Sequence, residues 1–263
     1  MRRSTLAYKL TRTVLPALLG LTAAIAAPAC AQDMPPAAPP EAAPASATPA
    51  DAAPAEARAL TSAEIAAFNK AVTDFSAGQA AQQKGDNQGA VTKYEAALPA
   101  IRTAVEADPA KMENVTFLAN ALYANAAAYG ALGQMDKVIP LYQESLPYWR
   151  TIVAANPQDA TSRKILAGIL VQVGNQKLGI QDRSGAQPYY AEALTLSRKA
   201  VADAPTDNVA RNLLLSALIG AGQTSTEEGM LEEALTMGKA MMADGTIDAV
   251  NRPTIEAMTQ RAG

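Results

Sequence analysis

The sequence predicts an all-α fold, an α-solenoid of about four antiparallel helix pairs, and two observations support this. Five residue types recur along the chain at a fixed period of 48 residues. The segments between the recurring prolines have the apolar periodicity of helices and not the alternation of strands. A fixed period of this size is typical of a chain built from stacked copies of one supersecondary unit, which presents a surface instead of enclosing a reaction site. The recurring residues are Pro109, Pro157, Pro205 and Pro253; Tyr94, Tyr142 and Tyr190; Leu98, Leu146 and Leu194; Arg102, Arg150 and Arg198; Val105, Val153 and Val201.

Each repeat is interpreted as two helices joined by a short turn. The turn contains a glycine in three units, at Gly85, Gly133 and Gly229. Thr61 and Glu64 stand three residues apart at the start of the first helix, a spacing that predicts a capping box. The predicted repeat domain covers residues 61–253, in units 62–109, 110–157, 158–205 and 206–253.

The units resemble the tetratricopeptide repeat family, whose repeat is usually 34 residues long. That family places a small residue late in the first helix, a glycine in the turn, and an alanine, an aromatic residue and a small residue in the second helix. The resemblance implies a right-handed solenoid with lengthened helices and a role in binding other proteins. The matching residues are Gly78, Gly85, Ala90, Tyr94 and Ala97 in the first unit; Ala126, Gly133, Val138, Tyr142 and Ser145 in the second; Gly174, Gln181, Ala186, Tyr190 and Ala193 in the third; and Gly222, Gly229, Ala234, Gly238 and Met241 in the fourth.

Two features depart from a regular repeat. Pro99 and Pro147 fall inside predicted second helices, where proline removes a backbone hydrogen bond, so each helix is either bent or broken there. Gly238 and the Asp244–Gly245 pair weaken the fourth unit. We therefore expect residues 254–263 to form a capping helix or tail over the open end of the array.

The N-terminal region predicts export. Residues 1–31 combine a basic leader, an apolar run and the Ala29–Cys30–Ala31 cleavage site of a secretory signal peptide. The apolar run is short for an uncleaved membrane anchor. A second interpretation, lipid modification of Cys30, is less favoured because Ala27 stands where bacterial lipoproteins carry leucine. Residues 32–60 are rich in Ala and Pro and predict a semi-extended tether, which places the repeat domain in the periplasm or outside the cell.

The composition of the mature chain restricts its chemistry. Cleavage after Ala31 leaves no cysteine and no histidine, and 18 of the 22 basic residues remain against 25 acidic ones, a net charge of −7. A disulfide, a thiolate nucleophile, an imidazole base and a His/Cys metal site are thereby excluded. The acidic balance argues against nucleic acid as a partner. We expect no enzymatic activity and no cofactor.

The arginine series has two interpretations. Arginine near the end of a helix complements the negative end of the helix dipole, and a row of guanidinium groups can also bind an acidic partner. Trp149, beside Tyr148, is interpreted as a filler between repeats.

The resemblance also implies a binding groove lined by the first helix of each unit. None of the twelve residues at the family's ligand-facing positions is charged, so we expect an uncharged groove that holds an extended or helical peptide. The alternative is that these side chains are covered by the long helices or by the tether. The twelve are Val72, Phe75, Gln79, Asn120, Tyr123, Ala127, Gly168, Val171, Asn175, Ser216, Ile219 and Gln223.

The predicted function is therefore that of an exported scaffold or adaptor for an envelope protein. The alternative is a periplasmic chaperone-like holdase or a structural spacer without a defined peptide ligand.

Overall fold

The computed structural model describes residues 57–226 and 228–262, and their regular structure is entirely α-helical. The predicted signal peptide and most of the predicted tether lie outside the described residues. The helices are α1 (Ser62–Gln83), α2 (Asn87–Ala107), α3 (Met112–Ala131), α4 (Met135–Ala155), α5 (Ala160–Gly179), α6 (Arg183–Asp203), α7 (Asn208–Thr224), α8 (Met230–Ala243) and α9 (Arg252–Ala262).

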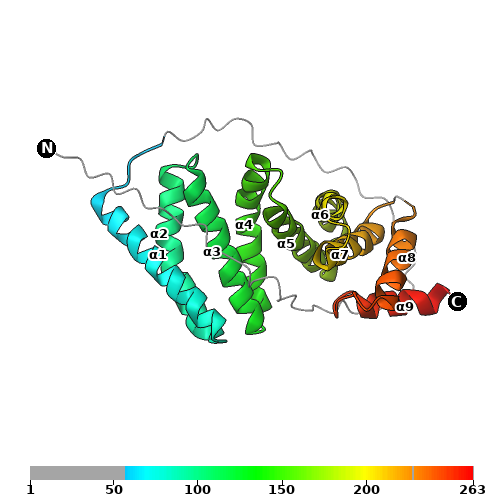
Figure 1. Cartoon of the computed structure of the whole chain (residues 1–263). Helices are drawn as coiled ribbons and strands as arrows, with labels where there is room; N and C mark the ends of the chain where they lie inside the picture. The colour runs from blue at the N-terminus through cyan, green and yellow to red at the C-terminus, as the bar shows by residue number, and fades with distance from the viewer. Residues whose placement is uncertain (1–56, 227, 263) are drawn as a thin grey trace.

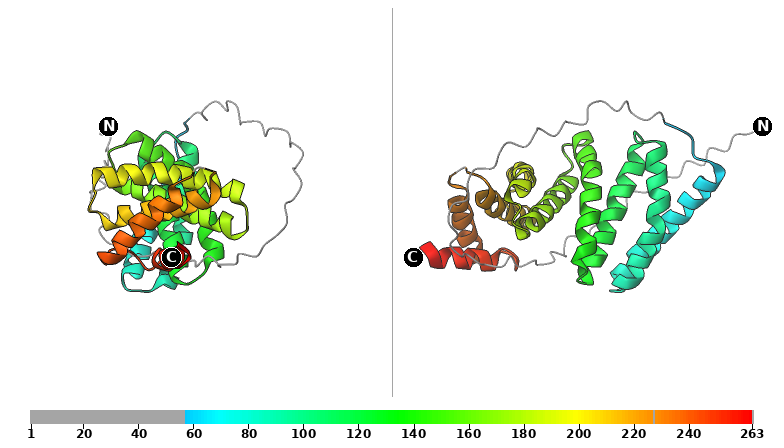
Figure 2. Two further views of the ribbon diagram at one scale, coloured as in Figure 1. Left: turned by 90° about the vertical axis from the view of Figure 1, so that its right-hand side faces the viewer. Right: turned by 180° about the vertical axis from the view of Figure 1, so that it is seen from behind.

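The helices stack in chain order as antiparallel pairs. Each helix packs against the next one along the chain, and Figure 1 shows the series running from α1 at one end to α8 and α9 at the other. The pairs overlap when the array is viewed along its length (Figure 2). The predicted all-α solenoid of four helix pairs is therefore confirmed.

A continuous apolar core runs from α1 to α7, and a second cluster joins α7, α8 and α9. One cluster of buried side chains extends from Ala71 in α1 to Ala217 in α7. Trp149 belongs to it with only 2% of its surface exposed, which confirms its role as a filler. Two of the recurring tyrosines lie over glycines, since an added Cβ would come within 2.6 Å of the Tyr94 ring at Gly78 and within 3.0 Å of the Tyr190 ring at Gly174.

The turns between paired helices require a left-handed backbone conformation. Gly85, Gly133 and Gly229 have φ angles of +79°, +73° and +89°, values that glycine adopts without steric cost. The turn between α5 and α6 has Gln181 at this point, with φ of 63°. In the third unit, Gln181 therefore adopts a left-handed conformation that a glycine adopts in the other units.

Replacing Gln181 with glycine is expected to stabilise the protein. A side-chain-bearing residue in the left-handed region costs about 1–2 kcal/mol, and the greater flexibility of glycine in the unfolded chain offsets part of that gain. We expect a net gain of about 0.5–1 kcal/mol in the free energy of unfolding, measured by urea denaturation. Gly133→Gln, the reverse change in the neighbouring unit, should destabilise, and a Gln181→Gly variant less stable than the parent would contradict the argument.

The prolines in the second helices do not break them. Pro99 lies inside the continuous helix α2, and Pro140 and Pro147 lie inside α4. Pro188 lies inside α6 in the same way. Of the two alternatives for Pro99 and Pro147, the broken helix is thus excluded.

The fourth unit is followed by helix α9, which begins at Arg252. Helix α8 has only 14 residues, and α9 packs against it. Ile255 of α9 is fully buried against Gly238, the position that holds a tyrosine in the other units, and a Cβ added there would lie 2.5 Å from the Ile255 side chain. The glycine that weakens the tetratricopeptide pattern here provides the space for the capping helix.

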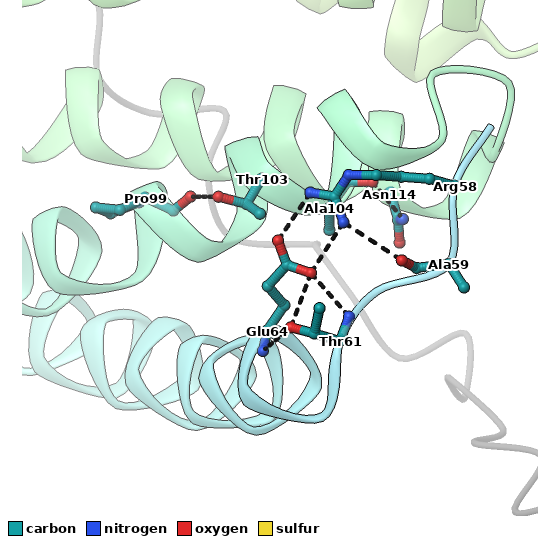
Figure 3. Close-up of polar contacts among 8 residues, drawn as sticks. All are labelled: Arg58, Ala59, Thr61, Glu64, Pro99, Thr103, Ala104 and Asn114. Atoms are coloured by element: carbon teal, nitrogen blue, oxygen red, sulfur yellow. Dashed lines mark hydrogen bonds and ion pairs between the residues drawn. The ribbon is translucent and has the colours of Figure 1, made fainter. Parts of the chain in front are cut away.

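The chain enters the array through an anchored segment next to α1 (Figure 3). The predicted capping box is present, with Thr61 Oγ1 accepting from the Glu64 backbone and the Glu64 carboxylate accepting from the Thr61 backbone. Arg58 donates two further hydrogen bonds to that carboxylate, at 2.9 and 2.7 Å. The bonds from Arg58, followed by that from the Thr61 backbone, lower the pKa of Glu64 to about 2. The Arg58 backbone also donates to Ala107 O at 2.8 Å, which fixes this segment at the end of α2.

Candidate functional site

The helices form two layers with different neighbours. The backbone of α1 approaches that of α3 and the backbone of α5 approaches that of α7, whereas no two of α2, α4, α6 and α8 come within 8 Å between Cα atoms and these four are joined only through long side chains. We call α1, α3, α5 and α7 the first helices and the other four the second helices. The twelve predicted groove residues all lie on first helices.

The twelve residues are mostly half-buried. Ala127 and Val171 are buried, and Gln223 is exposed. The half-buried ones are Val72, Phe75, Gln79, Asn120, Tyr123, Gly168, Asn175, Ser216 and Ile219.

The larger aromatic members also support the core. The Tyr123 ring stacks on Tyr142 with 6.1 Å between ring centroids and meets Trp149 edge-on at 6.2 Å. Burial raises the pKa of both tyrosines. A change at Tyr123 would therefore disturb packing as well as any bound partner.

Several of the polar members bond within the chain. The Tyr190 hydroxyl donates to Asn175 Oδ1 at 2.6 Å, and Asn120 Nδ2 donates to a backbone carbonyl of its own helix at 2.9 Å. Ser216 Oγ donates to Asn251 Oδ1 at 2.9 Å, so the segment before α9 reaches this end of the row. Gln223 is the one member of the twelve that is exposed.

The most aromatic part of the first-helix layer lies where α1 meets α3. The rings of Phe68 and Phe117 meet edge-on at 5.8 Å, and Phe75 meets Phe117 edge-on at 5.2 Å. All three are half-buried, and they are the only phenylalanines in the sequence. Phe68 and Phe117 were not among the predicted residues. The sequence feature that could have pointed to them is the distribution of phenylalanine, because every phenylalanine falls within the first two units.

The arginine series forms a ladder of ion pairs along the second helices. Arg102 binds Glu144 at 2.6 and 2.9 Å, Arg150 binds Glu192 at 2.9 and 2.7 Å, and Arg198 binds Glu233 at 2.6 Å. Each rung joins one helix pair to the next.

This ladder replaces both earlier interpretations of the arginines. The interpretation that these arginines complement the negative end of the helix dipole is wrong, because α2, α4 and α6 have no basic residue in their last turn. The guanidinium groups are engaged within the chain instead of facing an acidic partner. Because the paired side chains are a third to a half exposed, each rung is worth at most about 1 kcal/mol. The first unit has Ala96 at the glutamate position. The fourth unit has Ala240 at the glutamate position and Thr246 at the arginine position, so its rung is made by Glu233, seven residues before Ala240.

A polar hollow of about 480 Å³ lies between α2 and α4, with α3 as its floor. Asn125 and Tyr129 of α3 line the floor, and the Tyr129 hydroxyl donates to Glu95. Burial, followed by the bond to Glu95 and its negative charge, raises the pKa of Tyr129 to about 12. The remaining lining residues are Leu98, Arg102, Asp136, Lys137, Pro140, Leu141 and Glu144.

The described residues contain no group of three or more His, Cys, Asp or Glu side chains placed to hold a metal ion. None of the helices in this part of the chain has the length and apolar character needed to cross a membrane.

Stacked antiparallel helix pairs, a tyrosine packed on glycine in the first and third pairs, and a left-handed residue in each turn define the class as a tetratricopeptide-like α-solenoid. No family model and no curated protein matches the chain. Among solved structures, it is similar to the "Crystal structure of MamA protein", at 15% identity over 66% of this chain and 95% of that chain, with a TM-score of 0.27. At that TM-score the likeness transfers no residue role and no function to this chain.

Proposed function

We propose that this chain is a non-enzymatic, exported scaffold that binds a segment of another envelope protein on its first-helix layer. The observation that carries the proposal is the half-buried aromatic cluster of Phe68, Phe75 and Phe117 across α1 and α3. Aromatic side chains that are partly exposed and held in place by neighbours are typical anchors of protein interfaces.

The twelve predicted groove residues have the uncharged character expected of a surface that binds a peptide. None of the twelve predicted groove residues is charged, and Ile219 continues the half-buried apolar series in the fourth unit. An extended or helical segment would place apolar side chains against this series and its backbone against the amides of Gln79 and Gln223. In this proposal, residues 1–31 direct export and are removed, and residues 32–60 act as a spacer.

The test is site-specific photo-crosslinking in cells that express the full chain. A crosslinking amino acid at Gln79 in the groove is compared with one at Gln143, an exposed residue of the second helix α4. We expect a discrete adduct from position 79 and none from position 143. Phe68→Ala should reduce the adduct roughly tenfold or more, because truncating an aromatic anchor costs about 2 kcal/mol or more.

The matched control is Ile65→Ala, which removes an apolar side chain that is 48% exposed on the same helix. This change should leave the adduct intact. A broad set of adducts from both crosslinking positions, insensitive to Phe68→Ala, would contradict the proposal. Suppressed aggregation of an unfolded test protein by the same chain would then support the holdase alternative.

A further inference from the structure

Methionine is concentrated at the C-terminal end of the array. Five of the nine methionines of the sequence lie between residues 230 and 258. Two of them replace residues that contain no sulfur in the other units: Met242 stands at the position of the recurring leucines, and Met241 at a position that holds alanine or serine. The five are Met230, Met237, Met241, Met242 and Met258.

All five methionines belong to the apolar cluster that joins α7, α8 and α9. Met241 is fully buried, and the other four are half-buried around the edge of the cluster. We call these four, Met230, Met237, Met242 and Met258, the terminal methionines. They pack against aliphatic side chains that are buried, among them Leu215 and Leu218 of α7 and Ile255 of α9. The thioethers thus lie between solvent and the core of this end of the array.

The two last helices depend on this cluster for their position. Helix α8 has 14 residues and α9 has 11, whereas α1 to α6 have at least 20 each. The backbone of α9 comes within 8 Å of that of α8 and of no other described helix, measured between Cα atoms, and Figure 1 shows the two at the end of the series. Helices this short gain most of their stability from the packing of an apolar face.

Thioether sulfur is a group that mild oxidants attack. A peroxide transfers one oxygen atom to the sulfur: an S–O bond forms, the O–O bond breaks, the sulfur loses two electrons, and the peroxide is reduced to water or an alcohol. The product, methionine sulfoxide, is polar and disrupts an apolar cluster. The single cysteine of the sequence is Cys30, so no thiol among the described residues competes for the oxidant.

We propose that the terminal methionines are an oxidation site for hydrogen peroxide or an alkyl hydroperoxide, and that their sulfoxides release α8 and α9 from α7. Each unit of a repeat array contacts only its neighbours, so the release stays at this end and leaves α1 to α6 folded. It uncovers the apolar face of α7 that carries Leu215 and Leu218. Reduction of the sulfoxides restores the covered state. The site is separate from the aromatic cluster on α1 and α3.

The test is treatment of the purified chain with hydrogen peroxide, followed by two measurements on the same sample. Peptide mass spectrometry locates the added oxygen atoms, and hydrogen–deuterium exchange reports the protection of each helix. We expect sulfoxides at the terminal methionines and faster exchange in α8 and α9, by roughly tenfold for each sulfoxide, because an unpaired polar group in an apolar cluster costs about this factor. Exchange in α1 to α6 should stay unchanged, and methionine sulfoxide reductases should restore the protection.

Substitutions separate the terminal methionines from the others. Leucine at all four keeps the apolar volume and accepts no oxygen, so α8 and α9 should stay protected after peroxide. Met242→Leu alone introduces the residue of the other three units and should remove part of the effect. The matched control replaces Met112 and Met135 with leucine. These two are also half-buried but begin α3 and α4, so the effect should persist in that variant.

Three results would overturn the proposal. The first is a parent chain whose α8 and α9 stay protected while Met242 and Met258 carry sulfoxides. The second is an absence of sulfoxides at the terminal methionines after peroxide treatment. The third is an equal loss of protection in the parent and in the variant with four leucines. The first two measurements use the parent chain, so they decide the matter even where that variant fails to fold.

Discussion

Trp149→Ala is expected to lower the free energy of unfolding by about 3–5 kcal/mol, the usual cost of truncating a buried large aromatic side chain. The indole is 2% exposed and lies within the cluster that runs from α1 to α7. Its removal would leave a cavity between units and deprive Tyr123 of an edge-on neighbour. Urea denaturation followed by circular dichroism measures the loss.

Trp149→Phe is the matched control. The indole Nε1 makes no hydrogen bond with the described residues, so a phenyl ring would lose volume and no polar partner. We expect this variant to lose much less stability, on the order of 1–1.5 kcal/mol. An alanine variant within about 1 kcal/mol of the parent would show that the helix pairs close the cavity by moving together.

Gly220→Ala is expected to destabilise by about 2–3 kcal/mol, although alanine is the better helix former. An added Cβ would lie 2.1 Å from the Tyr190 ring, closer than atoms can approach. The ring has no room to retreat, because its other side faces Gly174, where a Cβ would lie 3.0 Å away. Its hydroxyl is held by Asn175 at 2.6 Å. The overpacking cost therefore exceeds the gain in helix propensity.

The control for this prediction is Gly179→Ala, also within a helix. An added Cβ there meets nothing within 4 Å, so the change should be neutral or slightly stabilising. The double variant Gly220→Ala with Tyr190→Leu should lose less than the sum of the single changes, because the smaller side chain removes the clash. If the stability losses of the two single changes were additive, the destabilisation by Gly220→Ala would not come from a clash with the tyrosine ring.

The contacts within a helix pair could be predicted from the sequence, because they follow from local rules. The capping box at Thr61 and the turn glycines need only the residues of one unit. The tyrosine packed on a small residue, as in Tyr94 on Gly78, is likewise repeated within each regular unit. Such contacts recur with the period and are visible as soon as the period is recognised.

The contacts between units could not be predicted in the same way. The period shows that Arg102, Arg150 and Arg198 are equivalent, but their partners depend on how each helix pair is rotated onto the next. Gly220 belongs to the fourth unit and contacts a tyrosine of the third for the same reason. The groove residues were inferred from a family resemblance and not from the period itself.

Asn125 illustrates a different limit. The sequence alone shows an asparagine where three units have apolar residues, but the helical pattern does not reveal whether it faces solvent or the core. Only the packing of α3 between α2 and α4 shows that it is buried beneath a hollow.

The ladder of arginine–glutamate pairs has a consequence for how such a chain can grow. The middle units each carry both partners at equivalent positions, Glu144 with Arg150 and Glu192 with Arg198. The first unit has only the arginine, and the last supplies Glu233 from a position seven residues before the equivalent Ala240. A duplicated copy of residues 110–157 would therefore bring its own donor and acceptor and join the series at either boundary. A duplicated end unit would interrupt it. With respect to these ion pairs, only the middle units can therefore be repeated without leaving a glutamate or an arginine unpaired between neighbours.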